Sequence, residues 1–233
     1  MKYKSPINDN TTAHRSADYD DQICQTIPYY QAFHEETIQL IKTCQPEPSV
    51  WLDTGCGTGA LVQKCLAAFP AATYILSDPA ASMLEIARAK FAEQDNRVSF
   101  LEPAATADIP SNLRPRPTVI TAIQAHHYLS ESERHQATMK CYDLLDADGI
   151  FITFENVLPM TAAGVDIGKR YWERYQLSSG RTKSQTERQL ARLGCEFFPI
   201  TIQKHLELYK KCGFKTVELF WLSYMQAGFY CLK

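Results

Sequence analysis

The 233-residue sequence lacks several features that would assign it to a large class of proteins at once. No apolar run reaches the roughly 18 residues of a membrane-spanning helix, and residues 1–21 lack the apolar core of a signal peptide. Lysine and arginine are scattered and the formal net charge is −2, a pattern that does not indicate nucleic-acid binding. We therefore expect a cytoplasmic chain without direct contact to nucleic acid or membrane. Residues 1–27 are predicted to form an N-terminal tail, frayed or ordered by a ligand.

The sequence also lacks any C-x-x-C pair, although it contains eight cysteines. Most of them lie within apolar or helical patterns, where a thiol acts as a small hydrophobic group. We therefore expect reduced cysteines, as in other cytosolic proteins, and no metal site.

Short apolar stretches alternate with helical periodicity in the first two thirds of the chain. The predicted strands are at residues 50–54, 73–77, 97–101, 118–123 and 150–154. The predicted helices before and between them are at residues 28–44, 60–69, 80–93 and 131–145. This alternation predicts a doubly wound, Rossmann-like α/β fold, with a mostly parallel sheet and helices on both faces.

The pattern changes after Glu155. Three helices and then two β-rich runs are predicted there, at residues 165–178, 185–193, 202–212, 214–221 and 224–232. The two runs form an antiparallel terminal hairpin that brings the sheet to seven strands. The sequence thus predicts one domain over residues 28–233, with a helical insertion at about 157–200 before the last two strands. We expect the insertion to cover a ligand cleft at the carboxyl ends of the strands.

The most informative motif is Asp53-Thr54-Gly55-Cys56-Gly57-Thr58-Gly59, at the end of the first predicted strand. Its glycines also fit the dinucleotide fingerprint, so they do not choose the ligand alone. Asp53 distinguishes the possible ligands, because a carboxylate at this position repels a pyrophosphate but attracts an ammonium group. The helix N-terminus that follows the turn favours a carboxylate. An acid facing a helix N-terminus suits an amino acid, and indicates the methionine end of S-adenosylmethionine.

Together with later motifs, this turn resembles the class I S-adenosylmethionine-dependent methyltransferases over roughly residues 29–154 and again in the hairpin. The resemblance implies that Asp78 binds the ribose, that Met83 and the pair Asp108-Ile109 contact the adenine, and that Gln124 lies near the sulfonium. Local roles compete with these, namely a helix cap for Asp78, a turn for Asp108 and core packing for Met83. The residues implied for the cofactor are Tyr30, Asp53, Gly55, Cys56, Gly57, Gly59, Asp78, Pro79, Met83, Asp108, Ile109 and Gln124.

A closer resemblance is to a branch of this superfamily, the carboxy-S-adenosylmethionine synthases of tRNA wobble-uridine modification. Ile27-Pro28-Tyr29-Tyr30 is similar to a cofactor-contacting segment of that branch. The turn Gly57-Thr58-Gly59 departs from it, and neither Arg188 nor Arg192 falls clearly on the position of its carboxylate-binding arginine. We take the architecture from this branch, whereas the resemblance to the methyltransferases implies methyl transfer to a small molecule. A carboxylating synthase and a non-catalytic cofactor-binding module are the open alternatives, and a homodimer is an open expectation.

Candidate acceptor residues lie in two places. His126 and His127 follow the fourth predicted strand, where a histidine can remove a proton from an acceptor; packing or capping of the loop is the competing interpretation. In the insertion, Tyr171 and Tyr175 share a helix face. With the residues Arg170 and Arg174, they predict a pocket for a substrate that bears a carboxylate or phosphate. The competing interpretation is a helix with packed aromatic side chains and solvated arginines.

Overall fold

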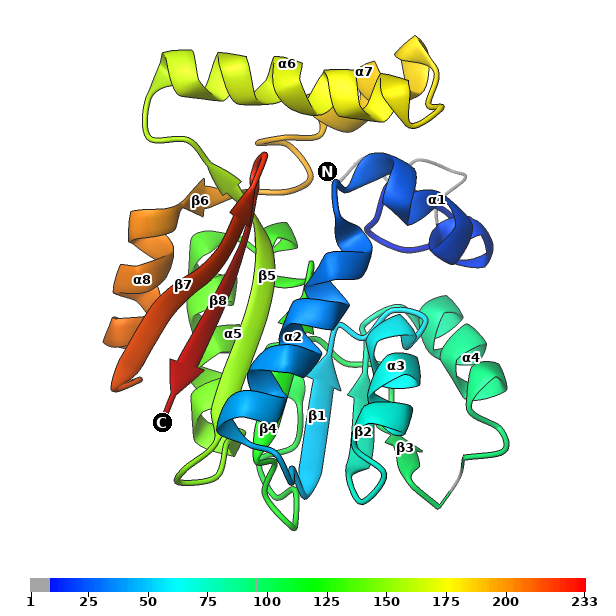
Figure 1. Ribbon diagram of the computed structural model, residues 1–233, viewed down its shortest axis with the longest axis vertical. Helices are drawn as coiled ribbons and strands as arrows, with labels where there is room; N and C mark the ends of the chain where they lie inside the picture. Colours follow the sequence, from blue (N-terminus) through cyan, green and yellow to red (C-terminus); the bar gives the residue numbers. More distant parts are fainter. Residues whose placement is uncertain (1–8, 95) are drawn as a thin grey trace.

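One mostly parallel sheet organises the molecule. A computed structural model describes residues 9–94 and 96–233 (Figure 1). The sheet order is β3-β2-β1-β4-β5-β8-β7, in which β1 to β5 are parallel and β8 runs antiparallel to β5 and β7. The strands are β1 (Val50–Thr54), β2 (Thr73–Ser77), β3 (Val98–Phe100), β4 (Val119–Ile123), β5 (Ile150–Leu158), β6 (Ile200–Thr201), β7 (Thr216–Ser223) and β8 (Gln226–Leu232).

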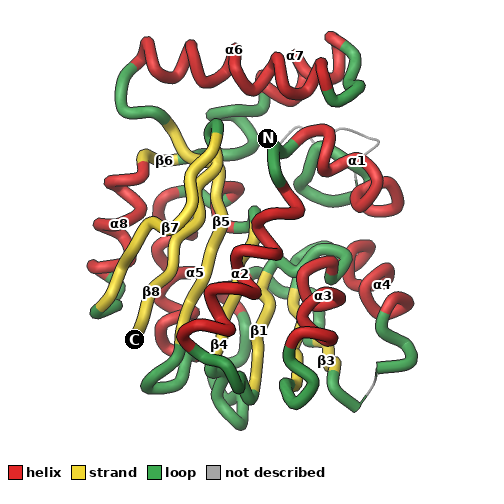
Figure 2. Tube along the Cα trace, viewed as in Figure 1, coloured by secondary structure: helices red, strands yellow, loops and turns green. Residues whose placement is uncertain are grey.

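Helices cover both faces of this sheet (Figures 1 and 2). Because side chains alternate along a strand, Trp51 joins the core under α2, α3 and α4, whereas its neighbour Leu52 joins the core under α5 and α8. The helices are α1 (Tyr19–Thr26), α2 (Tyr30–Cys44), α3 (Ala60–Ala68), α4 (Ala81–Lys90), α5 (Glu131–Leu144), α6 (Ala162–Ser178), α7 (Lys183–Ala191) and α8 (Ile202–Lys211). No helix in the described part of the chain has both the length and the apolar character to cross a membrane. The predicted α/β fold with its terminal hairpin is confirmed.

The predicted N-terminal tail over residues 1–27 needs correction. From Ser16 onward the chain folds into the short 3-10 helix η1 (Ser16–Asp18) and then α1, which buries Tyr19 and Ile23 in the main core. The other anchors of α1 are polar, since Asp20 accepts a hydrogen bond from the Thr58 hydroxyl (2.5 Å) and pairs with Lys90 (2.8 Å). These polar contacts join residues that are far apart along the chain, so local sequence patterns do not predict them. Residues 1–8 lie outside the described residues.

Strand β5 extends beyond its predicted end at residue 154. Its last residues include Glu155 and Asn156, which are polar yet buried. Glu155 accepts hydrogen bonds from His127, and Asn156 accepts one from the Gln226 side chain (3.0 Å). These partners come from distant parts of the chain, so a prediction from local hydropathy places the end of the strand too early. The short β6, which pairs with this end of β5, was not predicted either.

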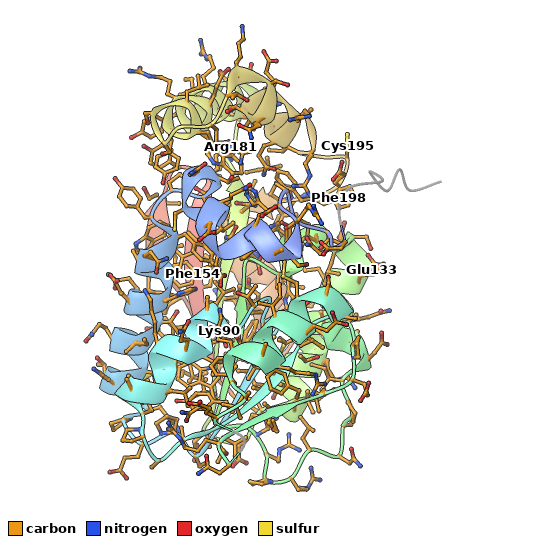
Figure 3. All side chains as sticks on the ribbon, turned by 90° about the vertical axis from the view of Figure 1, so that its right-hand side faces the viewer. Lys90, Glu133, Phe154, Arg181, Cys195 and Phe198 are labelled. Atoms are coloured by element: carbon orange, nitrogen blue, oxygen red, sulfur yellow. The ribbon has the colours of Figure 1, made fainter. Side chains whose placement is uncertain are left out.

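The insertion α6–α7 lies beyond the carboxyl ends of the strands and beside α1 (Figure 1). Trp172 donates a hydrogen bond from its indole nitrogen to the carbonyl of Thr26 (2.6 Å). Arg181, between the insertion and the N-terminal segment in Figure 3, donates to the Thr26 hydroxyl (2.7 Å). The insertion therefore rests on α1, and both together cover this end of the sheet.

Two glycines of the turn after β1 respond differently to an added side chain. Gly59 has φ +77°, and a Cβ there would lie 2.5 Å from the ring of Phe91. Gly57 has φ +55° but nothing within 4 Å of such a Cβ. We expect Gly59→Ala to lower the free energy of unfolding by about 3 kcal/mol, from backbone strain and overpacking together. Gly57→Ala carries only the strain of about 1 kcal/mol. Urea denaturation measures both, and equal losses would contradict this difference.

Candidate functional site

A cavity lies at the carboxyl end of β1. The turn residues 55–58 and the first residues of α3 form one side of it. Tyr19, Tyr30 and His34, from the N-terminal helices α1 and α2, form another side. Asp53 and Ile123 line it from the ends of β1 and β4. The structure thus brings the predicted Tyr30, Asp53 and glycine turn to one place.

Asp53 is buried in this cavity, with 2% of its surface exposed. Its carboxylate accepts a hydrogen bond from the Thr121 hydroxyl (2.6 Å) and forms no ion pair with a cation of the described residues. Burial raises the pKa of Asp53 to about 7; the Thr121 hydrogen bond opposes this rise and the charge of Asp78 adds to it. An unpaired buried carboxylate is costly, so this site favours a cationic ligand.

Asp78, at the end of β2, holds the glycine turn. One carboxylate oxygen accepts from the backbone nitrogen of Gly57 (2.9 Å) and the other from that of Ala80 (2.8 Å). Burial raises its pKa, although these hydrogen bonds oppose the rise. Pro79 is exposed and Met83 is buried in the core. Met83 therefore has the core role weighed for it, whereas Asp78 does not cap α4, whose N-cap is Ala80. Each oxygen of Asp78 still has a free lone pair for a ribose.

Asp108 and Ile109, which are predicted to contact the adenine, do not line this cavity. Asp108 ends the 3-10 helix η2 (Thr106–Asp108) and is exposed in a separate hollow beside α5. Ile109 packs in the core under α5 and α8. The tight turn directs Thr106 inward instead, where its hydroxyl lies 2.7 Å from that of Thr54 and 3.2 Å from Nε2 of His126.

The two predicted histidines lie in the 3-10 helix η3 (His126–Tyr128), after β4. His127 is 1% exposed, and its Nδ1 lies 2.8 Å from Oε2 of the buried Glu155. Burial alone raises the pKa of Glu155, but the hydrogen bond and charge of His127 outweigh it and lower that pKa to about 2. Nε2 of His127 has no hydrogen-bond partner among the described residues. A histidine oriented by a carboxylate through one nitrogen presents the other nitrogen as a proton acceptor.

The neighbouring residues Gln124 and His126 make local contacts. Gln124 adopts φ +55° and donates from its backbone and side-chain nitrogens to the carbonyl of Phe154 (2.7 and 3.3 Å). It directly follows Ile123, which lines the cavity. Burial lowers the pKa of His126 to about 4, although the charge of Glu155 acts in the opposite direction. The imidazole of His126 is therefore neutral at neutral pH.

The substrate residues predicted in the insertion do not line the cavity beside β1. Arg170 and Arg174 are exposed. Tyr171 stacks on Tyr224 with 54% of its surface exposed, and the Tyr175 hydroxyl donates to the carbonyl of Cys24 (2.6 Å). The helix turns Trp172 inward, so its neighbours face outward. These contacts are compatible with the competing interpretation of packed aromatic side chains and solvated arginines, and the substrate role of these residues stays a prediction.

Sequence reasoning missed Tyr19, His34 and Thr58 as residues that line the cavity. His34 had a usable signal, because it lies one helical turn after the predicted Tyr30 and so on the same face of α2. Tyr19 also had a signal, the helical spacing of Tyr19, Ile23 and Ile27, which the assignment of this stretch to a tail passed over.

Comparison with known proteins agrees with this geometry. Residues 52–151 match a family model described as a methyltransferase domain. The chain is similar to a carboxy-S-adenosyl-L-methionine synthase of Campylobacter lari, with 27% identity over 203 residues that cover 86% of this chain and 84% of the relative.

Two solved structures share the fold at low sequence identity. The plantazolicin methyltransferase BpumL superposes with a TM-score of 0.67 at 12% identity, over 93% of this chain and 88% of that chain. PigF superposes with a TM-score of 0.66 at 16% identity, over 94% of this chain but 58% of that chain, so this chain spans little more than half of PigF. The sheet order, the glycine turn and these matches support a class I S-adenosylmethionine-dependent methyltransferase fold, with an architecture similar to that of the carboxy-S-adenosyl-L-methionine synthases.

Proposed function

We propose that this chain binds S-adenosylmethionine in the cavity beside β1 and transfers a methyl group to a small-molecule acceptor. The observation that carries this proposal is Asp53, a buried carboxylate without a cation partner, next to a glycine turn and a helix N-terminus. The sulfonium and ammonium of the cofactor supply the missing positive charge. When bound, the cofactor supplies an electrophilic methyl group. BpumL and PigF were both solved with S-adenosylhomocysteine, which supports this choice of cofactor.

The residues around the cavity provide the other requirements of methyl transfer. Orientation and exclusion of water account for most of such catalysis. Tyr19 and Tyr30 are buried over the cavity, and the contacts of Asp20 with Thr58 and Lys90 hold α1 in place there. Helix α1 therefore shields the cofactor from water on this side of the cavity.

His127 is the proposed proton acceptor for an acceptor that arrives protonated. Glu155 engages its Nδ1 (2.8 Å), so in the neutral ring Nε2 carries the free lone pair. His126 has a different role, since its Nε2 already contacts the Thr106 hydroxyl (3.2 Å). Of the two predicted histidines, His127 is the one with a ring nitrogen oriented by a buried carboxylate and the other nitrogen, Nε2, buried without a hydrogen-bond partner among the described residues.

A carboxy-S-adenosylmethionine synthase is the second candidate function. It is favoured by the similarity to the synthase of Campylobacter lari, which covers 86% of the chain. The two arginines considered for an extra carboxylate do not add support. Arg192 is engaged by Glu196 (2.7 Å) and Gln189 (2.9 Å), and Arg188 is exposed on α7.

Mass spectrometry of the ligand that purifies with the chain separates these functions. S-adenosylmethionine or S-adenosylhomocysteine supports the methyltransferase, and a carboxylated sulfonium supports the synthase. Incubation with methyl-labelled cofactor and a small-molecule extract then tests catalysis, because a non-catalytic module leaves the label on the cofactor. The absence of any adenosyl ligand, combined with no binding of added cofactor, contradicts both functions.

The proposed partner is thus a small molecule. A homodimer and a cytoplasmic location stay predictions from the sequence. Light scattering of the purified chain measures the first, and fractionation of the source cells measures the second.

A further inference from the structure

Arg181 is a buried cation without a counter-charge. It lies in the turn between α6 and α7, beside the N-terminal segment in Figure 3, and 9% of its surface is exposed. Its guanidinium donates to the Thr26 hydroxyl (2.7 Å) and to the carbonyl of Gln185 (3.3 Å). Its Nε has no hydrogen-bond partner, and no acid in the described part of the chain forms an ion pair with it. Because a guanidinium stays charged in a protein, this burial favours the binding of an anion.

Two uncharged polar side chains adjoin the same turn, Gln176 on α6 and Thr186 on α7. Both are fully buried, and neither the amide of Gln176 nor the hydroxyl of Thr186 has a hydrogen-bond partner among the described residues. The backbone nitrogen of Arg181 donates to the carbonyl of Gln176 (3.0 Å), and its guanidinium reaches the carbonyl of Gln185, directly before Thr186. Buried polar groups are hydrogen-bonded as a rule, so three groups without partners at one turn indicate a ligand.

The side chains that act electrostatically on Arg181 are themselves positive. Burial lowers the pKa of Arg181, and the charges of Arg188 and Arg192 add to this effect. Arg192 is paired with Glu196 (2.7 Å), whereas Arg181 and Arg188 form no ion pair with the described residues. An anion bound at Arg181 therefore relieves both the burial of an unpaired charge and the repulsion among the arginines.

We propose that Arg181 binds an oxyanion, a carboxylate or a phosphate group, together with the amide of Gln176 and the hydroxyl of Thr186. Guanidinium, amide and hydroxyl groups all donate hydrogen bonds to such oxygens. The amide oxygen of Gln176 also has no partner among the described residues, which suits an oxyanion that carries a hydroxyl, such as hydrogen phosphate. None of these three residues lines the cavity beside β1, so this site is separate from that of the cofactor.

The oxyanion ties the insertion to helix α1, because the Arg181 guanidinium also donates to the hydroxyl of Thr26, the last residue of α1. It belongs either to a free ion or to the methyl acceptor itself. Only the second of these sources rests on the proposed function.

Thermal denaturation with inorganic phosphate tests this site. The chain is first saturated with S-adenosylhomocysteine, which keeps phosphate out of the cavity beside β1. Phosphate at about ten times its Kd is expected to raise the melting temperature of the wild-type chain by about 4 °C, relative to sodium chloride of equal ionic strength. Arg181→Met is expected to show no such rise. Lys183→Met removes an exposed cation two residues away and is expected to keep it.

Two milder variants keep the test informative if Arg181→Met does not fold. Gln176→Leu and Thr186→Val replace groups without partners by apolar groups of similar shape, so neither is expected to lower the melting temperature without phosphate. Each is expected to weaken phosphate binding about tenfold in isothermal titration calorimetry. The inference is overturned if phosphate does not stabilise the wild-type chain, if it stabilises Arg181→Met to the same extent, or if both milder variants bind it as tightly as the wild type.

Transfer of a labelled methyl group in the small-molecule extract identifies the source of the oxyanion. Inhibition of this transfer by phosphate indicates that the acceptor carries the oxyanion, whereas unchanged or faster transfer indicates a free ion. Failure of the proposed function is a separate result. A chain that binds no S-adenosylhomocysteine contradicts that function, and phosphate binding at Arg181 is then measured on the free chain with the same variants.

Discussion

Asp53→Asn is expected to weaken S-adenosylmethionine binding about 100-fold at about pH 8, a loss of about 2.7 kcal/mol. The wild-type carboxylate is buried in the cavity and has only the Thr121 hydroxyl as a partner (2.6 Å). The amide keeps the size of the side chain but removes the charge that a sulfonium and an ammonium group require. Calorimetric titration of the two purified chains measures this difference.

The same side chain predicts how binding depends on pH. The pKa of Asp53 is raised to about 7, so acidification from about pH 8 to about pH 6 protonates it and weakens binding of the cationic ligand. The raised pKa also affects the stability of the ligand-free fold. The contribution of protonated Asp53 to that stability is complete below pH 3.8, the usual pKa of an aspartate, and is lost as the pH rises through about 7. S-adenosylmethionine should therefore raise the melting temperature more at about pH 8 than at about pH 6. Asp53→Asn should show little of this pH dependence.

Asp108→Asn is the matched control for this prediction. It makes the same chemical change at an acid that the sequence placed at the adenine, but that the structure exposes beside α5. We expect its affinity to equal that of the wild-type chain. Loss of binding in Asp108→Asn without loss in Asp53→Asn would contradict this assignment of the site.

Glu155→Gln is expected to lower the free energy of unfolding by about 3–5 kcal/mol. The buried Glu155 accepts hydrogen bonds from the backbone nitrogens of His126 (3.2 Å) and His127 (2.8 Å), from Nδ1 of His127 (2.8 Å) and from the Thr153 hydroxyl (2.6 Å). All four partners donate to the carboxylate. The amide nitrogen of glutamine is itself a donor, so it cannot accept the hydrogen bonds of the donors that it would face. Urea denaturation measures the loss.

The acid dependence of stability provides a second readout for Glu155. Its pKa is lowered to about 2 from its usual 4.5. The stability it contributes is therefore present above about pH 4.5 and is lost as pH falls toward about 2. Glu155→Gln should remove this component, and Glu85→Gln, at an exposed position on α4, should keep it. A free energy of unfolding for Glu155→Gln within about 1 kcal/mol of the wild type would contradict the proposed network.

Much of the fold was predictable because local patterns determine it. Strands β1 and β2 begin and end where predicted, since each is a short apolar run between turn residues. The glycine turn and Asp53 were predictable for the same reason, as they directly follow β1 along the chain. The helices of the insertion were found within three residues of their observed starts at Ala162 and Lys183.

Features that depend on distant contacts were not predictable from the sequence. Helix α1 is held by Thr58 and Lys90, and no local signal shows this. Asp108 occurs in a motif of the right kind, but the tight turn of η2 rotates it away from the cavity. The partnership of His127 with Glu155 joins two elements 28 residues apart, and appears only once β4 and β5 are paired.

A crystal structure of the chain with S-adenosylmethionine tests the central claim most directly. We expect the ligand in the cavity beside β1, with its ammonium group within hydrogen-bond distance of Asp53. We also expect the methyl group to face the side of the cavity formed by the end of β4. A ligand that makes no contact with Asp53, or density for an extra carboxyl group on the sulfonium, would contradict the central claim.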